Sequence, residues 1–315
     1  MTESSRKILS NYEVRKTYKQ KSAFIDYVTE YAKEKGYSAK VEKGASKSRN
    51  IVLGNPETAK VVYTAHYDTC PRLPFPNFIT PKNIFIYVLY QIALTIFLLG
   101  IPMLIAIGVG ELLRAFTTPD DVARIIQVWT EYIGILVILY LMMMGPANPH
   151  TANDNTSGVT TLVNIMDNLP ENLRDSTAFI FFDLEEVGLV GSSSYAKAHK
   201  AAMKDKLLIN FDCVSDGKTI LFAMKKGADK YLEELKFSFP TTEEFTTEFL
   251  SKGVIYPSDQ ARFPLGVGVA ALKKTKRGLL YMNRIHTAKD TVFEEENIDY
   301  LTDGAIKLAE VMSNK

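Results

Sequence analysis

Two adjacent glutamates, Glu185 and Glu186, follow directly on an apolar run and could carry acid–base or metal chemistry. The run from Ala178 to Phe182 is continuously apolar, which is typical of a strand buried on both faces of a sheet. Sheets of this kind bind ligands where their strands end. Because neighbouring carboxylates point in different directions, one can coordinate a metal ion while the other moves a proton. A solvated loop is the alternative for a Glu-Glu pair considered alone.

A second apolar run also ends in polar side chains. The residues from Lys60 to Ala65 are predicted to form a strand that leads into His66 and Asp68. Alternation along a strand places these two side chains on one face, so Asp68 could hold the imidazole ring of His66. A core histidine with no ligand role is the alternative.

Three further candidate residues lie at strand ends or in the loops beyond them. Asp212 ends the apolar strand that begins at Lys206, Asp154 lies in a loop before a helix, and His286 follows the segment from Gly278 to Met282. An aspartate before a helix is commonly an N-cap, which is the alternative for Asp154. Carboxylates and imidazoles without thiolates suit zinc, manganese or cobalt. A carboxylate between two imidazole-bearing sets suits a bridged pair of metal ions about 3.5 Å apart.

Strands that alternate with helices must position these residues. The pattern predicts an α/β sandwich around a mostly parallel sheet. Helices are expected from Tyr12 to Lys35, from Val159 to Met166 and from Asn297 to Met312, and part of the segment from Tyr231 to Leu250 is expected to be helical.

Two apolar segments interrupt this pattern, from Ile84 to Gly110 and from Ile125 to Gly145, and each is long enough to cross a bilayer. The Leu, Ile and Val residues of the second segment favour insertion by about 3 to 6 kcal/mol, against at most about 3 kcal/mol for Glu131. We therefore predict a transmembrane helical hairpin at residues 83–147, inserted between the two parts of a catalytic domain, residues 1–82 and 148–315. A hairpin buried in the interface of a homo-oligomer is the alternative.

Charge and cysteine content restrict the partners and the compartment. The chain has 37 Lys and Arg residues against 36 Asp and Glu residues, so a nucleic-acid partner is not expected. Cys70 and Cys213 do not resemble a disulfide framework, and the N-terminal residues have no apolar signal core. Because His66 precedes the hairpin and Asp154 follows it, an even number of crossings is required. A catalytic domain on the cytoplasmic face of the membrane is expected.

The ordered motifs resemble those of the co-catalytic di-zinc aminopeptidases, metallopeptidase family twenty-eight. The motifs are His66-x-Asp68, Ala152-Asn-Asp-Asn-x-Ser-Gly158, Glu185-Glu-x-Gly-Leu-x-Gly-Ser192, Asn210-x-Asp212 and His286-Thr-x-x-Asp290. The resemblance extends from about Lys60 to the C-terminal helix, except for the apolar insertion. It implies a zinc-exopeptidase-like three-layer sandwich.

The resemblance also implies a role for each matching residue. His66 and Asp212 would bind one zinc ion, Glu186 and His286 would bind a second, and Asp154 would bridge the two zinc ions. Glu185 would be the general base and Asp68 would orient His66. The family's usual cis peptide would here join Asp154 and Asn155.

Two departures from the family pattern concern the substrate. Gln260 stands third in a loop that often reads Ser-Asp-His, and Ile285 replaces a tyrosine that precedes the last histidine ligand in some members. Loss of a donor aimed at developing charge can lower the rate by about 100-fold or more.

The expected function is that of a membrane-anchored zinc aminopeptidase that removes N-terminal residues from peptides. The alternatives are hydrolysis of lipid-linked or N-acyl amino acid amides, a glutaminyl-cyclase-like acyl transfer, and a catalytically silent binding protein of the same fold. The link between hairpin and strand ends is expected to bring the hairpin close to the active-site rim, so that an apolar amide substrate could enter from membrane lipid.

Overall fold

A nine-stranded sheet forms the centre of a computed structural model that describes all 315 residues. The strands are β1 (Ala39–Lys43), β2 (Arg49–Leu53), β3 (Val61–His66), β4 (Thr177–Phe182), β5 (Leu207–Phe211), β6 (Thr219–Met224), β7 (Thr246–Leu250), β8 (Gly266–Lys274) and β9 (Leu280–Tyr281). Their order is β1-β2-β4-β3-β5-β8-β6-β7, and β9 pairs with β8. The central strands β4, β3, β5 and β8 run parallel, whereas β2 and β6 pair antiparallel with their inner neighbours.

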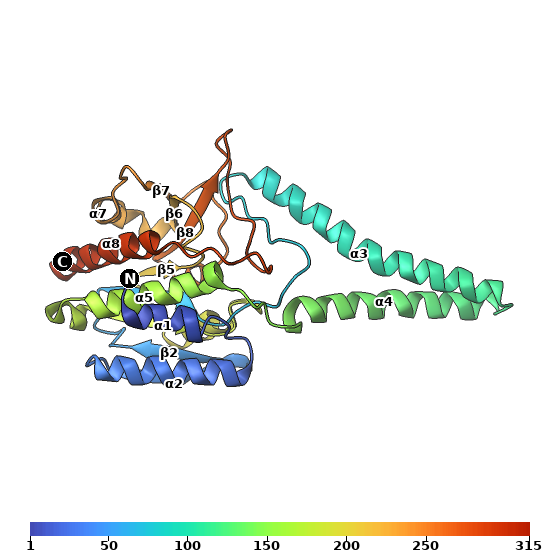
Figure 1. Cartoon of the computed structure of the whole chain (residues 1–315), viewed down its shortest axis with the longest axis horizontal. Helices are drawn as coiled ribbons and strands as arrows, with labels where there is room; N and C mark the ends of the chain where they lie inside the picture. The colour runs from blue at the N-terminus through green and yellow to red at the C-terminus, as the bar shows by residue number, and fades with distance from the viewer.

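Helices cover both faces of this sheet (Figure 1). The helices of the chain are α1 (Glu3–Asn11), α2 (Tyr18–Glu34), α3 (Ile84–Ala115), α4 (Asp120–Met144), α5 (Gly158–Asn168), α6 (Val190–Ala198), α7 (Leu232–Ser238) and α8 (Glu295–Ser313), and all but α3 and α4 belong to the sandwich. The prediction of an α/β three-layer sandwich around a mixed sheet is confirmed.

Side-chain alternation along the strands builds two cores. On β3 and β4, Val61, Tyr63 and Phe179 pack into a large cluster with α1, α2, α5, α7 and α8. Their neighbours Val62 and Ile180 pack on the opposite face against residues of α6 and the loop after it. Because both faces of these strands are buried, the sequence reads as an unbroken apolar run.

One edge strand was not predicted from the sequence, although the expectation that part of the segment from Tyr231 to Leu250 is helical is confirmed. The segment from Tyr231 to Leu250 contains only the short helix α7, and its last five residues form the edge strand β7. Strand β7 pairs parallel with β6, with Thr219 opposite Thr246. The strand is only partly buried and its local pattern is weak, so pairing with β6 decides its conformation.

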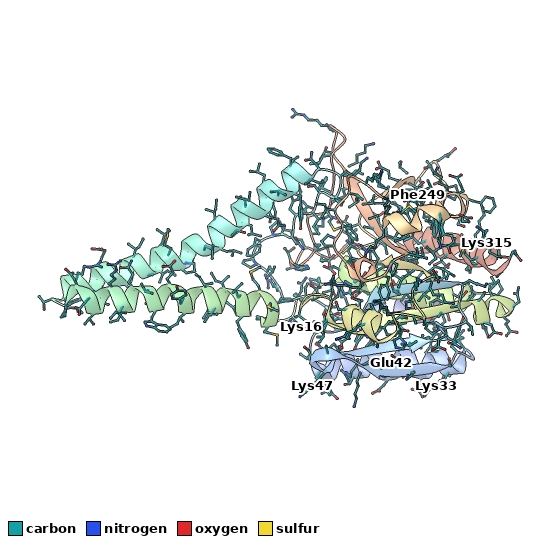
Figure 2. All side chains as sticks on the ribbon, turned by 180° about the vertical axis from the view of Figure 1, so that it is seen from behind. Lys16, Lys33, Glu42, Lys47, Phe249 and Lys315 are labelled. Carbon is teal, nitrogen blue, oxygen red and sulfur yellow. The ribbon has the colours of Figure 1, made fainter.

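Helices α3 and α4 form a long antiparallel hairpin that projects away from the sandwich (Figure 1). Pro102, Ala106 and Gly110, spaced four residues apart, are the buried residues of α3, and Gly134 of α4 packs against Pro102. Small residues allow the two backbones to approach closely. The large apolar side chains point outward along the hairpin, as the stick view shows (Figure 2).

A buried ion pair ties helix α2 to the end of β4. Lys21 Nζ lies 2.7 Å from Asp183 Oδ1, and the two side chains are 11% and 1% exposed. The other oxygen of Asp183 accepts the backbone N–H of Arg49, while Oδ1 also accepts that of Leu184. Asp183 therefore fixes the turn that leads into Glu185.

Substitution Lys21→Ala should lower the free energy of unfolding by about 3–5 kcal/mol, because it leaves the Asp183 carboxylate buried without its cation. The exposed Lys19 on the same helix provides a matched control, and Lys19→Ala should change stability by less than about 0.5 kcal/mol. Chemical denaturation in detergent, followed by circular dichroism, measures both variants. Equal stability of the two would contradict a stabilising role for the ion pair.

Candidate metal centre

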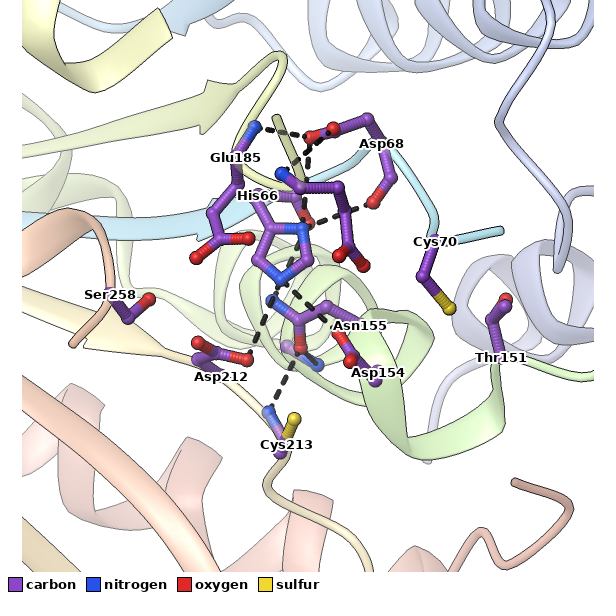
Figure 3. A network of polar contacts seen from close by, with 12 residues as sticks. His66, Asp68, Cys70, Thr151, Asp154, Asn155, Glu185, Asp212, Cys213 and Ser258 are labelled. Atoms are coloured by element: carbon purple, nitrogen blue, oxygen red, sulfur yellow. Dashed lines mark hydrogen bonds and ion pairs between the residues drawn. The ribbon is translucent and has the colours of Figure 1, made fainter. Parts of the chain in front are cut away.

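The carboxyl ends of three parallel strands meet at one edge of the sheet and supply most of the candidate residues. His66 is the last residue of β3, Asp212 follows β5, and Glu185 and Glu186 follow β4 after a short turn. Asp154 comes from the irregular turn at Ala152–Ser157, which precedes α5, and His286 comes from the loop after β9. The structure brings all of the sequence-predicted side chains together, and Figure 3 shows His66, Asp154, Glu185 and Asp212 around one space.

The two oxygens of the Asp154 carboxylate face different imidazoles. Oδ1 lies 3.4 Å from His66 Nε2, and Oδ2 lies 3.1 Å from His286 Nε2. The same His66 nitrogen lies 3.5 Å from Asp212 Oδ1, and the same His286 nitrogen lies 3.2 Å from Glu186 Oε2. Asp154 therefore stands between two sets that each contain one imidazole and one further carboxylate.

The donor set and its burial fit divalent cations. Candidate ligand atoms of His66, Asp154 and Asp212 lie within 4.8 Å of one another, as do those of Asp154, Glu186 and His286. The Oε1 atom of Glu186 is buried and has no hydrogen-bond partner. Oxygen and imidazole nitrogen ligands of this kind suit zinc, and a cation would offset the repulsion between buried carboxylates.

Burial and mutual repulsion shift the acid–base properties of the cluster. Burial raises the pKa of both Glu185 and Glu186 well above the ordinary range of a carboxyl group. Burial alone would lower the pKa of His66, but the nearby carboxylates of Glu185, Asp154 and Asp212 outweigh it and raise that pKa. A raised pKa makes Glu185 a stronger base than an exposed carboxylate.

Asp68 supports the site differently from the sequence expectation. The Nδ1 atom of His66 lies 3.0 Å from the backbone carbonyl oxygen of Asp68 but 3.7 Å from the carboxylate. The Asp68 carboxylate instead accepts the backbone N–H groups of Glu185 and Glu186, at 3.0 and 3.3 Å. One residue therefore orients the imidazole through its main chain and fixes both glutamates through its side chain.

Asparagines on either side of Asp154 hold its loop against the strand ends. The Asn155 amide donates to the carbonyl of Phe211 at 3.0 Å and accepts the N–H groups of Gly158 and Cys213. The Asn153 side chain accepts the N–H of Ser215. The peptide bond between Asp154 and Asn155 is cis, as the resemblance implied.

Sequence reasoning missed two residues that position this loop. The Asp290 carboxylate accepts the N–H groups of Asn153 and Asp154, both at 3.0 Å, although its place in the last motif could have drawn attention to it. Arg15 is fully buried and donates to the Tyr67 carbonyl at 2.5 Å and to Thr156 Oγ1 at 3.0 Å. No local pattern distinguishes Arg15 from a surface arginine.

A cavity of about 190 Å³ lies at the cluster, and the candidate ligands are among the residues that line it. Ile79, Met282 and Ile285 supply apolar walls, and Ile79 belongs to the link between β3 and α3. Asn77, from the same link, also lines the cavity, and its side-chain amide makes no hydrogen bond within the chain. The hairpin link therefore forms part of the cavity wall.

The first sequence departure does not place a donor in the cavity. Gln260 is buried away from this space, where its amide donates to the Tyr256 carbonyl at 2.7 Å. Tyr256 lines the cavity, and its hydroxyl donates to the carbonyl of Asp212 at 2.8 Å. The second departure, Ile285, is 3% exposed and presents only an apolar surface.

Several solved structures resemble this chain over nearly its whole length. The aminopeptidase LapA of Legionella pneumophila is 14% identical, with a TM-score of 0.56, over 99% of this chain and 68% of that one. A glutaminyl cyclase of Porphyromonas gingivalis is 15% identical, with a TM-score of 0.58, over 98% and 97%. A Zn-dependent exopeptidase of Parabacteroides distasonis is 16% identical, with a TM-score of 0.54, over 99% and 97%. At these identities the likeness establishes the fold alone.

Sequence comparison identifies the family. A search of curated proteins finds no match. The family model described as peptidase family M28 matches residues 140–309, which is more than half of the chain. The matched region contains Asp154, Glu185, Glu186, Asp212 and His286, and the remaining candidates, His66 and Asp68, meet them in the structure. The chain therefore belongs to peptidase family M28, and it is a metallopeptidase of that family or a related metal-dependent amidohydrolase.

Proposed function

We propose that the chain is a membrane-anchored, zinc-dependent hydrolase of amide bonds that acts as an aminopeptidase on the N-terminal residues of peptides. The observation that carries this proposal is the arrangement around Asp154, whose two oxygens face two separate imidazole–carboxylate sets. An arrangement of this kind suits two metal ions that share one carboxylate.

In this proposal His66 and Asp212 would hold one zinc ion, Glu186 and His286 would hold the other, and Asp154 would be shared by both. When bound, metal ions at these residues would polarise the scissile carbonyl and lower the pKa of the attacking water. The carboxylates of Asp68 and Asp290 accept hydrogen bonds from backbone N–H groups and so keep the ligands in place before substrate arrives.

Glu185 is the proposed general base. Its carboxylate accepts a proton from the attacking water and returns it to the amine nitrogen as the amide bond breaks. Support comes from its raised pKa and from its place beside His66 and Glu186, since candidate ligand atoms of all three lie within 4.8 Å of one another. Its backbone is fixed by the Asp68 carboxylate, so its position does not depend on a bound metal ion.

The cavity walls suit a substrate with an apolar group beside the scissile bond. Ile79, Met282 and Ile285 form the apolar part, and the Asn77 amide is free to hydrogen-bond a substrate main chain. Both a peptide and an N-acyl amino acid amide have these features. A panel of aminoacyl and N-acyl substrates, together with an N-terminal glutamine peptide, separates peptidase, acyl-amide hydrolase and cyclase activity.

The hairpin is the proposed membrane anchor. In the most apolar 18-residue stretch of each helix, 11% of the α3 residues and none of the α4 residues are buried. The core helix of a soluble domain is mostly buried. Large side chains such as Phe97, Trp129 and Leu136 are more than half exposed along it. Exposed apolar surface of this length fits the hydrocarbon core of a bilayer.

Cations surround the base of the hairpin on the catalytic side. Arg72, Arg277 and Lys289 are exposed and have no acidic partner, and Lys82 precedes α3. Lys16 donates to the Met143 carbonyl at the end of α4, near the hairpin base in Figure 2. Anionic headgroups attract such residues by about 1 kcal/mol each. This distribution supports a cytoplasmic catalytic domain, although Arg114 and Arg124 lie at the far end.

Substitution Glu185→Gln should lower turnover by about 100-fold to 10,000-fold, because an amide cannot accept the proton from the attacking water. Metal content should remain unchanged, since the proposal assigns no metal ion to Glu185. Steady-state kinetics and elemental analysis of the same preparation measure the two effects. Near-normal turnover with a full metal complement would exclude Glu185 as the base.

Substitution Asp154→Ala should reduce metal content at both positions, whereas Glu186→Ala or His286→Ala should each remove one equivalent. The difference follows because only Asp154 faces both imidazoles. Elemental analysis of the purified variants gives the stoichiometry. Two full equivalents in Asp154→Ala would rule out the bridging assignment.

Replacement of Ile84–Met144 by a short Gly/Ser linker should yield a soluble domain that still binds metal, with activity falling selectively on long-chain acyl substrates. The link that contains Asn77 and Ile79 stays in place in this variant, so the cavity walls are retained. The control is the intact chain, which should require detergent for extraction from membranes. An intact chain that is soluble without detergent would instead assign the hairpin to an interface between copies.

A further inference from the structure

Cys70 lies at the second of the two candidate metal positions. Its Sγ atom and one ligand atom each from Asp154, Glu186 and His286 all lie within 4.8 Å of one another. Cys70 follows Asp68 by two residues and is fully buried. The first position, formed by His66, Asp154 and Asp212, contains no sulfur atom. The two positions therefore differ in the chemistry that they offer a metal ion.

A second observation points to a ligand at this position. The Glu186 side chain is 5% exposed, and its Oε1 atom is buried with no hydrogen-bond partner. A buried carboxylate oxygen without a partner is costly unless a cation or a donor reaches it. Because Glu186 and Cys70 belong to the same group of ligand atoms, a metal ion there would contact both.

One side-chain amide is directed at the sulfur atom. The Asn148 side chain places its Nδ2 atom 3.8 Å from Cys70 Sγ, and the same amide donates to the Thr287 carbonyl at 2.9 Å. The backbone N–H of Asn148 also donates to the carbonyl of Cys70. An amide fixed in this way directs an N–H group toward the sulfur, and partners of this kind commonly orient metal ligands.

We propose that Cys70 Sγ is a fourth protein ligand of the metal ion held by Asp154, Glu186 and His286. The inference rests on the metal centre of the proposed function. Metal binding forms a metal–sulfur bond, breaks the S–H bond and releases one proton to solvent, because a coordinating thiol is deprotonated. The expectation of a site without thiolates is thereby replaced, for this position alone, by a mixed set of sulfur, nitrogen and oxygen ligands.

The thiolate makes the two positions chemically unequal. Sulfur ligands favour zinc over manganese and magnesium, whereas carboxylate and imidazole ligands discriminate less. With Cys70 the second position also has four protein ligands, against three at the position that contains His66. The second metal ion should therefore be the more tightly bound of the two.

Cobalt replacement tests the ligand directly and needs no turnover. A thiolate bound to Co²⁺ gives an intense near-ultraviolet charge-transfer absorption that oxygen and nitrogen ligands do not give. The intact detergent-solubilised chain, loaded with two equivalents of Co²⁺, should show this absorption. Cys70→Ser should lose it, while Cys213→Ser should keep it, because Cys213 is equally buried but belongs to no group of candidate ligands.

The outcomes separate this inference from the proposed function. Two bound cobalt ions without the charge-transfer absorption in the unsubstituted chain would overturn the role of Cys70 and leave the hydrolase proposal intact. Absence of any bound cobalt would overturn both. Since the unsubstituted chain alone decides the point, poor folding of Cys70→Ser does not weaken the test.

Zinc affinity provides a second measurement. In chelator competition, one zinc ion should bind at least about 10-fold less tightly to Cys70→Ser than to Cys213→Ser. Loss of a residue that only hydrogen-bonds a metal ligand already lowers affinity by this factor, and loss of a ligand itself should lower it at least as much. Manganese should displace zinc from Cys70→Ser more readily than from Cys213→Ser. Equal zinc affinity in both variants would contradict the inference.

Discussion

The carboxylates of Asp154, Glu186 and Asp212 repel one another in a buried space, and much of the surrounding structure holds them there. Such a cluster is costly without cations, because each charge has left water. Three features offset part of that cost within the chain. Backbone N–H groups are directed at Asp68 and Asp290, two imidazoles lie between the acidic groups, and Arg15 is buried beside the loop that contains Asp154. Divalent cations would supply the remainder.

The parallel centre of the sheet determines how these groups can meet. Strands β4, β3 and β5 end at one edge, so residues far apart in sequence arrive within a few ångströms of each other. The hairpin is inserted between β3 and the loop of Asp154, and the link that leads from β3 to the hairpin passes the cavity through Asn77 and Ile79. In the proposed membrane arrangement, the same short link both anchors the domain and lines its cavity. A substrate with an apolar group would then reach the cavity close to the membrane surface.

Much of the fold and of the candidate site could be predicted from the sequence, because the relevant signals are local. Buried strands such as Ala178–Phe182 are continuous apolar runs, and the polar residues that follow them are the ones that reach the cluster. One strand was not predicted, and the omission has a physical reason. Thr246–Leu250 has no strong pattern of its own and becomes a strand by pairing with β6. Asp68 contacts His66 through its backbone carbonyl and the glutamates through its carboxylate. These contacts depend on the position of the turn after β4, which no local sequence pattern predicts.

By itself the sequence determined which residue types stand at the ends of the buried strands. The reason is that the apolar pattern that marks a buried strand is local to each segment. It also determined that the hairpin is long and apolar enough to cross a membrane. Only the tertiary structure decided which distant groups approach one another. Arg15 reaches Thr156, Asp290 reaches the backbone of Asp154, and Cys70 joins Glu186 and His286. Such contacts join segments separated by tens to more than two hundred residues, and they arise from the packing of the whole sandwich.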